Sequence, residues 1–467
     1  MSINASRFAA NAATRRLFFF TALLFVAEIF LALSTHVERR WQWLALILLC
    51  AMSLVCSLMI VRQRESLAVT ANLVLLCALL TRLPALFALP LFDDDYFRFM
   101  WDGHQLLSGL SPFATAPAAY FSQTLVEPAW EAVLSGINHP DVPTIYGPSL
   151  QALFGVAAYI GGADAFALKA IFVVADVLLV VLLLRSNAPT WLVLLYVVNP
   201  LPIKEIGFSL HPDGVIALAL TLALVALRRH RGLGAAACVA AVVCAKLPLV
   251  LLASALNLRR ALHRQVLLGG ALIGLCAYLP FLYPDPLLPF VGLRAFANGW
   301  RYNALGFHLF EWLAGAHARV LLSAFYVASS ILVSCWVATG RHATATAMVL
   351  LLMVILLTAP TVNPWYWLPL LPLGIAAFHH ERVLLVTPLI GSFVLLLGYA
   401  TASALSEMSL SPNPVVFHAD AGLTVLPVAT VAQVVVMVCS CGYDFFTIVS
   451  GRNRPERQRT ESSIHVT

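Results

Sequence analysis

Charged residues are scarce in this chain. Only 11% of its 467 residues are charged, whereas 61% are hydrophobic. A soluble globular domain carries roughly 25% charged residues, so we expect lipid to be the main solvent of this protein. The net charge of +6 comes largely from the two ends and a few arginine clusters. Basic residues beside apolar runs are typical of the cytoplasmic flanks of membrane spans, so we expect no nucleic-acid partner.

Other features are missing as well. The nine cysteines form no disulfide framework, because most lie inside apolar runs, and Cys439 and Cys441 point to different faces of a helix. The sequence shows neither the alternating pattern of a β-barrel nor an internal repeat nor a separate soluble domain. Backbone groups in hydrocarbon must be satisfied internally, so the spans are helices. The sequence therefore predicts an all-α polytopic membrane protein.

Apolar runs long enough to span a membrane recur along the chain. A span takes about 20 helical residues, and the runs predict a bundle of roughly 11 to 14 transmembrane helices. Basic residues before the first run indicate a cytoplasmic N-terminus, which places the long acidic loop after the third run outside. The predicted organisation is N-terminal transmembrane helices over 1–92, an extracytoplasmic acidic loop with the catalytic motif and interfacial helices over 93–145, a transmembrane bundle over 146–450 with polar loops at 199–214, 284–303 and 403–420, and a basic, disordered cytoplasmic tail over 451–467.

One apolar run, 233–257, has an arginine cluster on either side. A single span would place the two clusters on opposite sides of the membrane, against the usual excess of basic residues on one side. Two half-helices that meet near Lys246 and Pro248 would leave both clusters on the same side. Broken helices are tolerated where they line a cavity, so we favour the hairpin.

The segment DDDYFRFMWDG, which runs from Asp93 to Gly103, is the most informative part of the chain. Carboxylates at the mouth of a span are costly near hydrocarbon and indicate function, while the aromatic residues between them suit the membrane–water interface. Ion pairs from Arg98 to Asp94 and to Asp102 on a surface helix would explain the arginine. They leave three adjacent, mutually repelling acids unexplained. Repulsion and partial burial raise a carboxylate pKa, which suits a general base.

Isolated polar groups stand out among the later apolar runs. In the segment 199–214, His211 and Asp213 lack a third nearby ligand, so we predict no metal site there, and a polar turn at the membrane surface is an equally good interpretation. Lys246 lies deep in an apolar run, which favours a bound anion or a carboxylate partner. Arg301 presents a planar fork of donors that suits a phosphate. The run Trp365–Trp367 is typical of an aromatic belt.

Read in order, these segments resemble the GT-C superfamily of integral-membrane glycosyltransferases, and most closely its bacterial mannosyltransferase-like branch that uses polyprenyl-phosphate-linked sugars. One departure is Pro212, where that branch commonly has asparagine. The matching motifs are Asp94-Asp95, Arg98-Phe99, Trp101-Asp102-Gly103, Gly109-Leu110-Ser111-Pro112-Phe113, Tyr146-Gly147-Pro148, Asn199-Pro200, His211-Pro212-Asp213, Lys246-Leu247-Pro248 and Pro364-Trp365-Tyr366.

The resemblance implies a GT-C-like bundle that transfers a sugar, mannose or another hexose, from a polyprenyl-phosphate donor to a hydroxyl of a glycan or lipid acceptor, with inversion. It implies a bacterial inner (cytoplasmic) membrane protein whose active site faces the extracytoplasmic side. The expected base is Asp94, with Asp95 as the second choice. No cofactor is expected, although three acids could hold a divalent cation through their oxygens. The residues expected to bind the donor phosphate or substrate are Arg98, Asp102, His211, Asp213, Lys246 and Arg301.

Other functions fit parts of the same pattern. A transporter or flippase for a lipid-linked glycan also needs charges and broken helices within the membrane, but such families commonly show internal repeats. A polymerase or ligase that joins finished glycans is chemically close, and the sequence leaves it open. A non-enzymatic scaffold would not need acids clustered at the mouth of a span.

Overall fold

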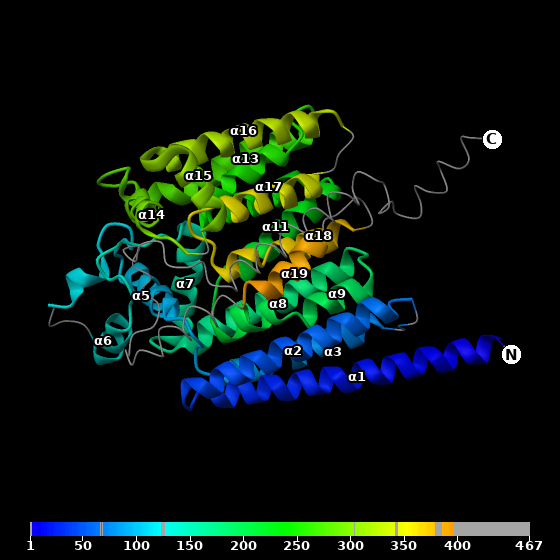
Figure 1. The fold of residues 1–467 in the computed structure, drawn as a ribbon. Helices are drawn as coiled ribbons and strands as arrows, with labels where there is room; N and C mark the ends of the chain where they lie inside the picture. Colours follow the sequence, from blue (N-terminus) through cyan, green and yellow to red (C-terminus); the bar gives the residue numbers. More distant parts are fainter. Residues whose placement is uncertain are drawn as a thin grey trace.

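The protein is a bundle of helices that lie side by side (Figure 1). Over the described residues the chain contains no β-sheet, only an isolated bridge between Tyr302 and Thr361. Five described helices are long and apolar enough to cross a membrane, or six when one bent pair is counted as a span. The predicted all-α polytopic membrane protein is therefore confirmed. The computed structural model describes residues 2–65, 67, 69–122, 127–302, 304–340, 344–378 and 385–396.

The last apolar run of the predicted N-terminal helices, before the acidic loop, is divided into two helices. Arg82 lies at the break, where its guanidinium forms a buried ion pair of 2.8 Å with Asp176 and donates to the carbonyl oxygen of Val197 at 2.5 Å. Pro84 then occupies the first turn of the second helix, where its missing N–H is tolerated. The N-terminal helices are α1 (Ser2–Ser34), α2 (Arg39–Gln63), α3 (Ala71–Leu80) and α4 (Leu83–Phe87).

The acidic loop caps one end of the bundle, where α6 lies beyond the ends of the long helices (Figure 1). Helix α5 packs against α7 at a very short distance, because a Cβ added to Gly103 would lie 2.3 Å from the carbonyl oxygen of Phe154. Only glycine allows this approach, which explains the Gly of the Trp-Asp-Gly motif. The elements here are α5 (Asp95–Leu107), η1 (Pro117–Tyr120), α6 (Pro128–Ser135) and α7 (Pro148–Gly161).

The predicted polar loop 199–214 is instead largely helical and buried. After a bend of 42° from α9, a six-residue π-helical turn, η2, carries Lys204 and Glu205, both completely buried. The prediction of a loop was wrong because these two charges pair inside the protein and do not need solvent. The elements are α8 (Ala165–Arg185), α9 (Thr190–Val197), α10 (Pro200–Pro202), η2 (Ile203–Phe208) and α11 (Asp213–Arg228).

The run 233–257 turns back on itself at Lys246. Helices α12 (Gly232–Ala245) and α13 (Ala261–Tyr278) start together, because a Cβ on Gly232 would lie 3.2 Å from Leu262. Near their far ends, the Sγ of Cys244 lies 3.8 Å from the carbonyl oxygen of Gly274. The two helices therefore run in the same direction, and η3 (Leu247–Ala255) returns the chain between them. Both arginine clusters thus lie at one end, as the hairpin prediction requires.

The predicted loop 284–303 also contains a helix, α14, so the description of it as a loop was wrong. A Cβ on Gly292 of α14 would lie 2.4 Å from the carbonyl oxygens of Pro143 and Thr144, so this helix rests on the acidic loop. The predicted loop 403–420 and tail 451–467 lie outside the described residues. The remaining elements are η4 (Leu279–Phe281), α14 (Leu288–Gly299), α15 (Leu305–Ala314), η5 (Gly315–His317), α16 (Ala318–Ala338), α17 (Thr344–Thr358), η6 (Pro364–Trp367), α18 (Leu370–Ala377) and α19 (Val386–Val394).

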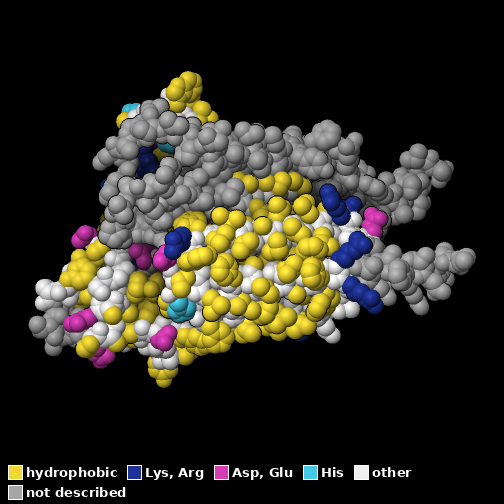
Figure 2. Space-filling view, turned by 60° about the horizontal axis from the view of Figure 1, so that its bottom comes forward, with side chains coloured by type: hydrophobic (Ala, Val, Ile, Leu, Met, Phe, Trp, Pro, Cys, Tyr) yellow, Lys and Arg dark blue, Asp and Glu magenta, His cyan; other side chains and the backbone are white. Residues whose placement is uncertain are grey.

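Figure 2 shows a broad apolar face between two polar ends. Lys and Arg side chains gather mainly at one end of this face, and Asp and Glu mainly at the other. Many large apolar side chains on the long helices are exposed, including Phe18 and Ile47 on α1 and α2. An exposed apolar band of this kind is the surface that a bilayer covers.

Candidate active site

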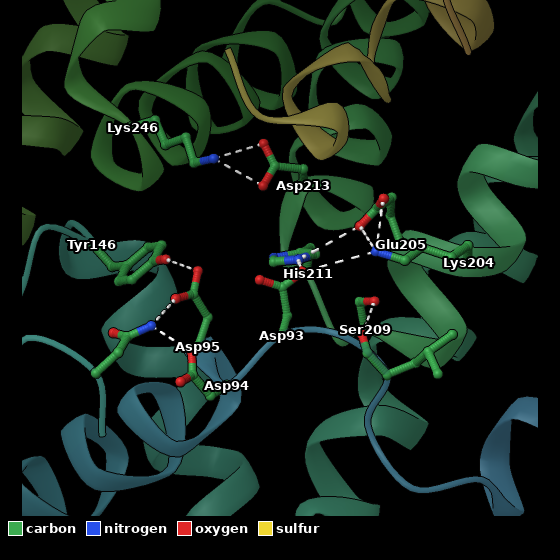
Figure 3. Close-up of polar contacts among 12 residues, drawn as sticks. Asp93, Asp94, Asp95, Tyr146, Lys204, Glu205, Ser209, His211, Asp213 and Lys246 are labelled. Atoms are coloured by element: carbon green, nitrogen blue, oxygen red, sulfur yellow. Dashed lines mark hydrogen bonds and ion pairs between the residues drawn. The ribbon is translucent and has the colours of Figure 1, made fainter. Parts of the chain in front are cut away.

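The three adjacent aspartates point in two directions, Asp93 toward His211 and Asp94 and Asp95 away from it (Figure 3). They follow Phe92, whose φ of 63° is rare for a residue other than glycine, and they lead into the first turn of α5. Such a backbone conformation costs about 1–3 kcal/mol and persists where the surroundings enforce it. After this turn, Asp93 pairs with Lys204 and His211, while Asp94 and Asp95 share the amide of Asn138.

Asp94 and Asp95 are held by neutral donors. The Nδ2 of Asn138 donates to Asp94 Oδ1 at 2.5 Å and to Asp95 Oδ1 at 3.1 Å, and the hydroxyl of Tyr146 lies 3.4 Å from Asp95 Oδ2. Within the described part of the chain, no basic side chain forms an ion pair with either carboxylate. These two acids are therefore anchored without a permanent counter-charge.

This environment changes how the two acids titrate. The Asp94 side chain reaches solvent, yet the protein around it removes part of its hydration. This loss of hydration, and then the carboxylates of Asp95 and Asp93, raise the pKa of Asp94 to about 6. Burial, then the carboxylate of Asp93, also raises the pKa of Asp95, while His211 and Lys246 partly oppose the rise. A carboxylate that titrates near neutrality can take up a proton from an acceptor hydroxyl.

Asp93 belongs to a buried group of charges. The Nζ of Lys204 lies 3.1 Å from Glu205 Oε1 and 3.8 Å from Asp93 Oδ2. The Nε2 of His211 lies 3.2 Å from the same Asp93 oxygen and 3.5 Å from Glu205 Oε2. Lys204, Glu205 and His211 are completely buried. We call these four residues the Lys204 cluster.

Lys246 pairs with a carboxylate, as we expected for a lysine deep in an apolar run. Its Nζ lies 2.7 Å and 2.8 Å from the two oxygens of Asp213, and 4.0 Å from the centre of the Tyr366 ring. Asp213 stands in the first turn of α11, where the helix dipole favours a negative charge. Lys246 itself lies at the break between α12 and η3, and 19% of its side chain is exposed. The third N–H of the ammonium can therefore donate a hydrogen bond to a bound anion.

The aromatic run Trp365–Trp367 is not a belt at the membrane surface. Trp365 and Trp367 are buried, and the Trp365 ring stacks on His211 with ring centres 3.5 Å apart. The belt prediction was wrong because η6 carries these rings inward, where Trp365 contacts His211 and Tyr366 contacts Lys246. The sequence analysis did not predict that these rings contact His211 and Lys246, although it had noted the Pro-Trp-Tyr motif.

Arg98 and Asp102 lie beneath the acidic pair instead of lining it. The Nη2 of Arg98 donates to the carbonyl oxygens of Val142 at 2.5 Å and His139 at 3.2 Å, while its Nη1 lies 4.0 Å from Asp102. Asp102 is completely buried and accepts from the Nε2 of Gln151 at 3.0 Å. Arg98 thus fastens the segment that carries Asn138. No ion pair joins Arg98 to Asp94 among the described residues, so that half of the predicted pairing does not form.

Arg301 stands apart from this group. Its Nη1 forms an ion pair of 2.7 Å with Glu311 of α15, and 42% of its side chain is exposed. The neighbouring Trp300 contacts His139 of the acidic loop, with ring centres 4.6 Å apart. The structure therefore brings Asp94, Asp95, His211, Asp213 and Lys246 into one site and leaves Arg301 at its edge.

Together the fold and the site define a multi-pass membrane protein with an acid pair of raised pKa and a mostly buried lysine beside it. A family model described as alpha-(1->6)-mannopyranosyltransferase, N-terminal domain, matches residues 20–261. The chain belongs to this family of GT-C-type mannosyltransferases, and it is a glycosyltransferase. The matched range includes every residue of the site except those on η6. Neither the curated proteins nor the solved structures give a match.

Proposed function

We propose that the protein transfers a mannosyl residue from a polyprenyl-phosphate donor to a hydroxyl of a glycan or glycolipid acceptor, with inversion, on the extracytoplasmic side of a bacterial inner membrane. The observation that carries the proposal is the arrangement of Asp94 and Lys246. The carboxylate of Asp94 reaches solvent and has a pKa of about 6. It shares one site with Lys246, which has one N–H that can donate to a bound anion. The family membership supports mannose as the sugar.

The chemistry needs a base on one side of the anomeric carbon and a cation on the other. Asp94 takes the proton of the acceptor hydroxyl as its oxygen attacks the anomeric carbon. The bond from that carbon to the phosphate oxygen breaks, and the leaving phosphate gains charge. Lys246, held by Asp213, stabilises this charge. A single displacement of this kind inverts the configuration.

The ends of α12 support the side of the membrane that we propose. Its first residue, Gly232, follows the arginine cluster at Arg228, Arg229 and Arg231. Its last turn contacts Gly147, which follows Tyr146 of the site: a Cβ on Gly147 would lie 2.1 Å from the carbonyl oxygen of Cys244. The basic clusters and the site therefore lie at opposite ends of the bundle. Since basic residues favour the cytoplasmic side, we place the site outside.

The test uses purified full-length protein, a radiolabelled polyprenyl-phosphate mannose and a glycan acceptor. Asp94→Asn keeps the shape of the side chain and removes the base, so transfer should fall by about 10²–10⁴-fold. The matched control is Asp141→Asn, because Asp141 is an exposed acid of the same loop. It should leave the rate unchanged. Equal rates for Asp94→Asn and the wild type would contradict the proposal, and donor movement across vesicles without transfer would favour a flippase.

A further inference from the structure

The Lys204 cluster brings together the donors of a metal site. Asp93 comes from the acidic loop and Glu205 and His211 come from the segment 199–214, and each offers a ligand atom within 4.8 Å of the others. A zinc-like ion with bonds of about 2.1 Å takes His, Asp and Glu as ligands and would draw these atoms only slightly closer. The donor set is therefore suited to a divalent cation.

An ammonium group already lies against the two carboxylates of this set. The Nζ of Lys204 lies 3.1 Å and 3.2 Å from the two oxygens of Glu205, and 3.8 Å from Asp93. It is completely buried, as is Glu205. Buried carboxylates need a paired positive charge, and Lys204 supplies it from inside the chain.

The backbone holds this ammonium in place. The amide of Leu91 donates to the carbonyl oxygen of Phe208 at 2.8 Å, and the hydroxyl of Ser209 donates to that of Leu91 at 2.8 Å. Leu210, which precedes His211, has a φ of 59°. The segment before Asp93 is thus bonded to the end of the π-helical turn η2 that carries Lys204, and such turns are frequent at functional sites.

We propose that Lys204 is a resident cation that takes the place of a divalent metal ion between Asp93, Glu205 and His211. It positions Asp93 and His211 beside the acid pair, and it excludes metal ions from the cluster. Two consequences follow. Without the ammonium the three ligands can bind a divalent ion, and mannosyl transfer by the wild type needs no divalent ion. Only the second consequence rests on the proposed function.

The experiment titrates Co²⁺, whose visible absorption reports its ligands, into the purified full-length protein in detergent. The wild type should bind no Co²⁺ in the cluster, whereas Lys204→Met should gain one Co²⁺ per chain. Lys246→Met is the matched control, because it removes another buried lysine whose partner is a single carboxylate. It should gain none. Adding His211→Gln to Lys204→Met should abolish the new absorption.

Several results would overturn the proposal. One is Co²⁺ absorption in the wild type that His211→Gln removes; this measurement decides the question even where Lys204→Met does not fold. Another is a folded Lys204→Met that binds no more Co²⁺ than Lys246→Met. A third is wild-type transfer that stops after treatment with EDTA and returns with Mn²⁺. Absence of transfer from every sample would instead overturn the proposed function, because the metal titration does not depend on activity.

Discussion

Asp93 and Asp94 are neighbours in the sequence, but the fold gives them opposite surroundings. Asp93 lies within 4 Å of two basic side chains, Lys204 and His211. Asp94 accepts a hydrogen bond from the neutral amide of Asn138. Loss of hydration and the neighbouring acids raise the pKa of Asp94, whereas Asp93 is paired with a buried ammonium. We therefore assign Asp93 a structural role and Asp94 the role of the base.

After Asp94→Asn, Lys246→Met should produce the largest effect on the chemical side. It removes the cation proposed for the leaving phosphate, and loss of one such group costs about 10²–10³ in kcat. Lys246→Arg keeps the charge and should retain part of the rate. The measurement is kcat for mannosyl transfer under saturating donor. A fall in kcat below tenfold would assign Lys246 to structure alone.

Arg98→Met should act mainly on stability. The side chain makes two buried hydrogen bonds to the backbone of the acidic loop, and such bonds to a charged group contribute about 1.5–3 kcal/mol each. The thermal midpoint of the purified protein should fall. Arg98→Lys should restore little of it, since a lysine lacks the planar fork. An unchanged midpoint with weaker donor binding would instead support the role in phosphate binding that the sequence predicts.

The pH dependence of two variants should move in opposite directions. The Asp93 carboxylate raises the pKa of Asp94, so Asp93→Asn should shift the acid limb of kcat/KM to lower pH. The Asn138 hydrogen bond lowers that pKa, so Asn138→Ala should shift the limb to higher pH. Rate profiles of both variants beside the wild type test this pair. Shifts in the same direction would show that the limb belongs to another group.

Arg301→Ala should have the smallest effect. Its guanidinium is half exposed and already paired with Glu311, and exposed ion pairs contribute about 0–1 kcal/mol. We expect donor KM and kcat to change less than about threefold on this basis. A change in donor KM comparable to that of Lys246→Met would place a phosphate at Arg301 and extend the site along α14.

The fold was largely predictable from the sequence, because apolar length decides where helices cross a bilayer. The break at Lys246 was also predictable, since two arginine clusters cannot both face one side across a single span. The helix over 288–299 was not predictable, because Pro289, Gly292 and Gly299 interrupt this short run as in a loop. The structure shows that it packs closely against Pro143 and Thr144.

The site was predictable only in part. The repulsion among three adjacent acids indicated function and pointed to Asp94. The partners of those acids were not predictable, because Asn138 and Lys204 are distant in sequence and approach only through the fold. The turn of Arg98 into the loop backbone depends on the same long-range contacts. The grouping of Asp93 with Glu205 and His211, and the contact of Lys204 with both acids, were equally beyond sequence reasoning.

The most direct test of the central claim is the pH dependence of kcat/KM for mannosyl transfer by the wild type. If Asp94 is the base, the rate should rise with pH and level off above about 6, where its carboxylate is ionised. A profile that stays flat from well below this pH to neutrality would contradict the account.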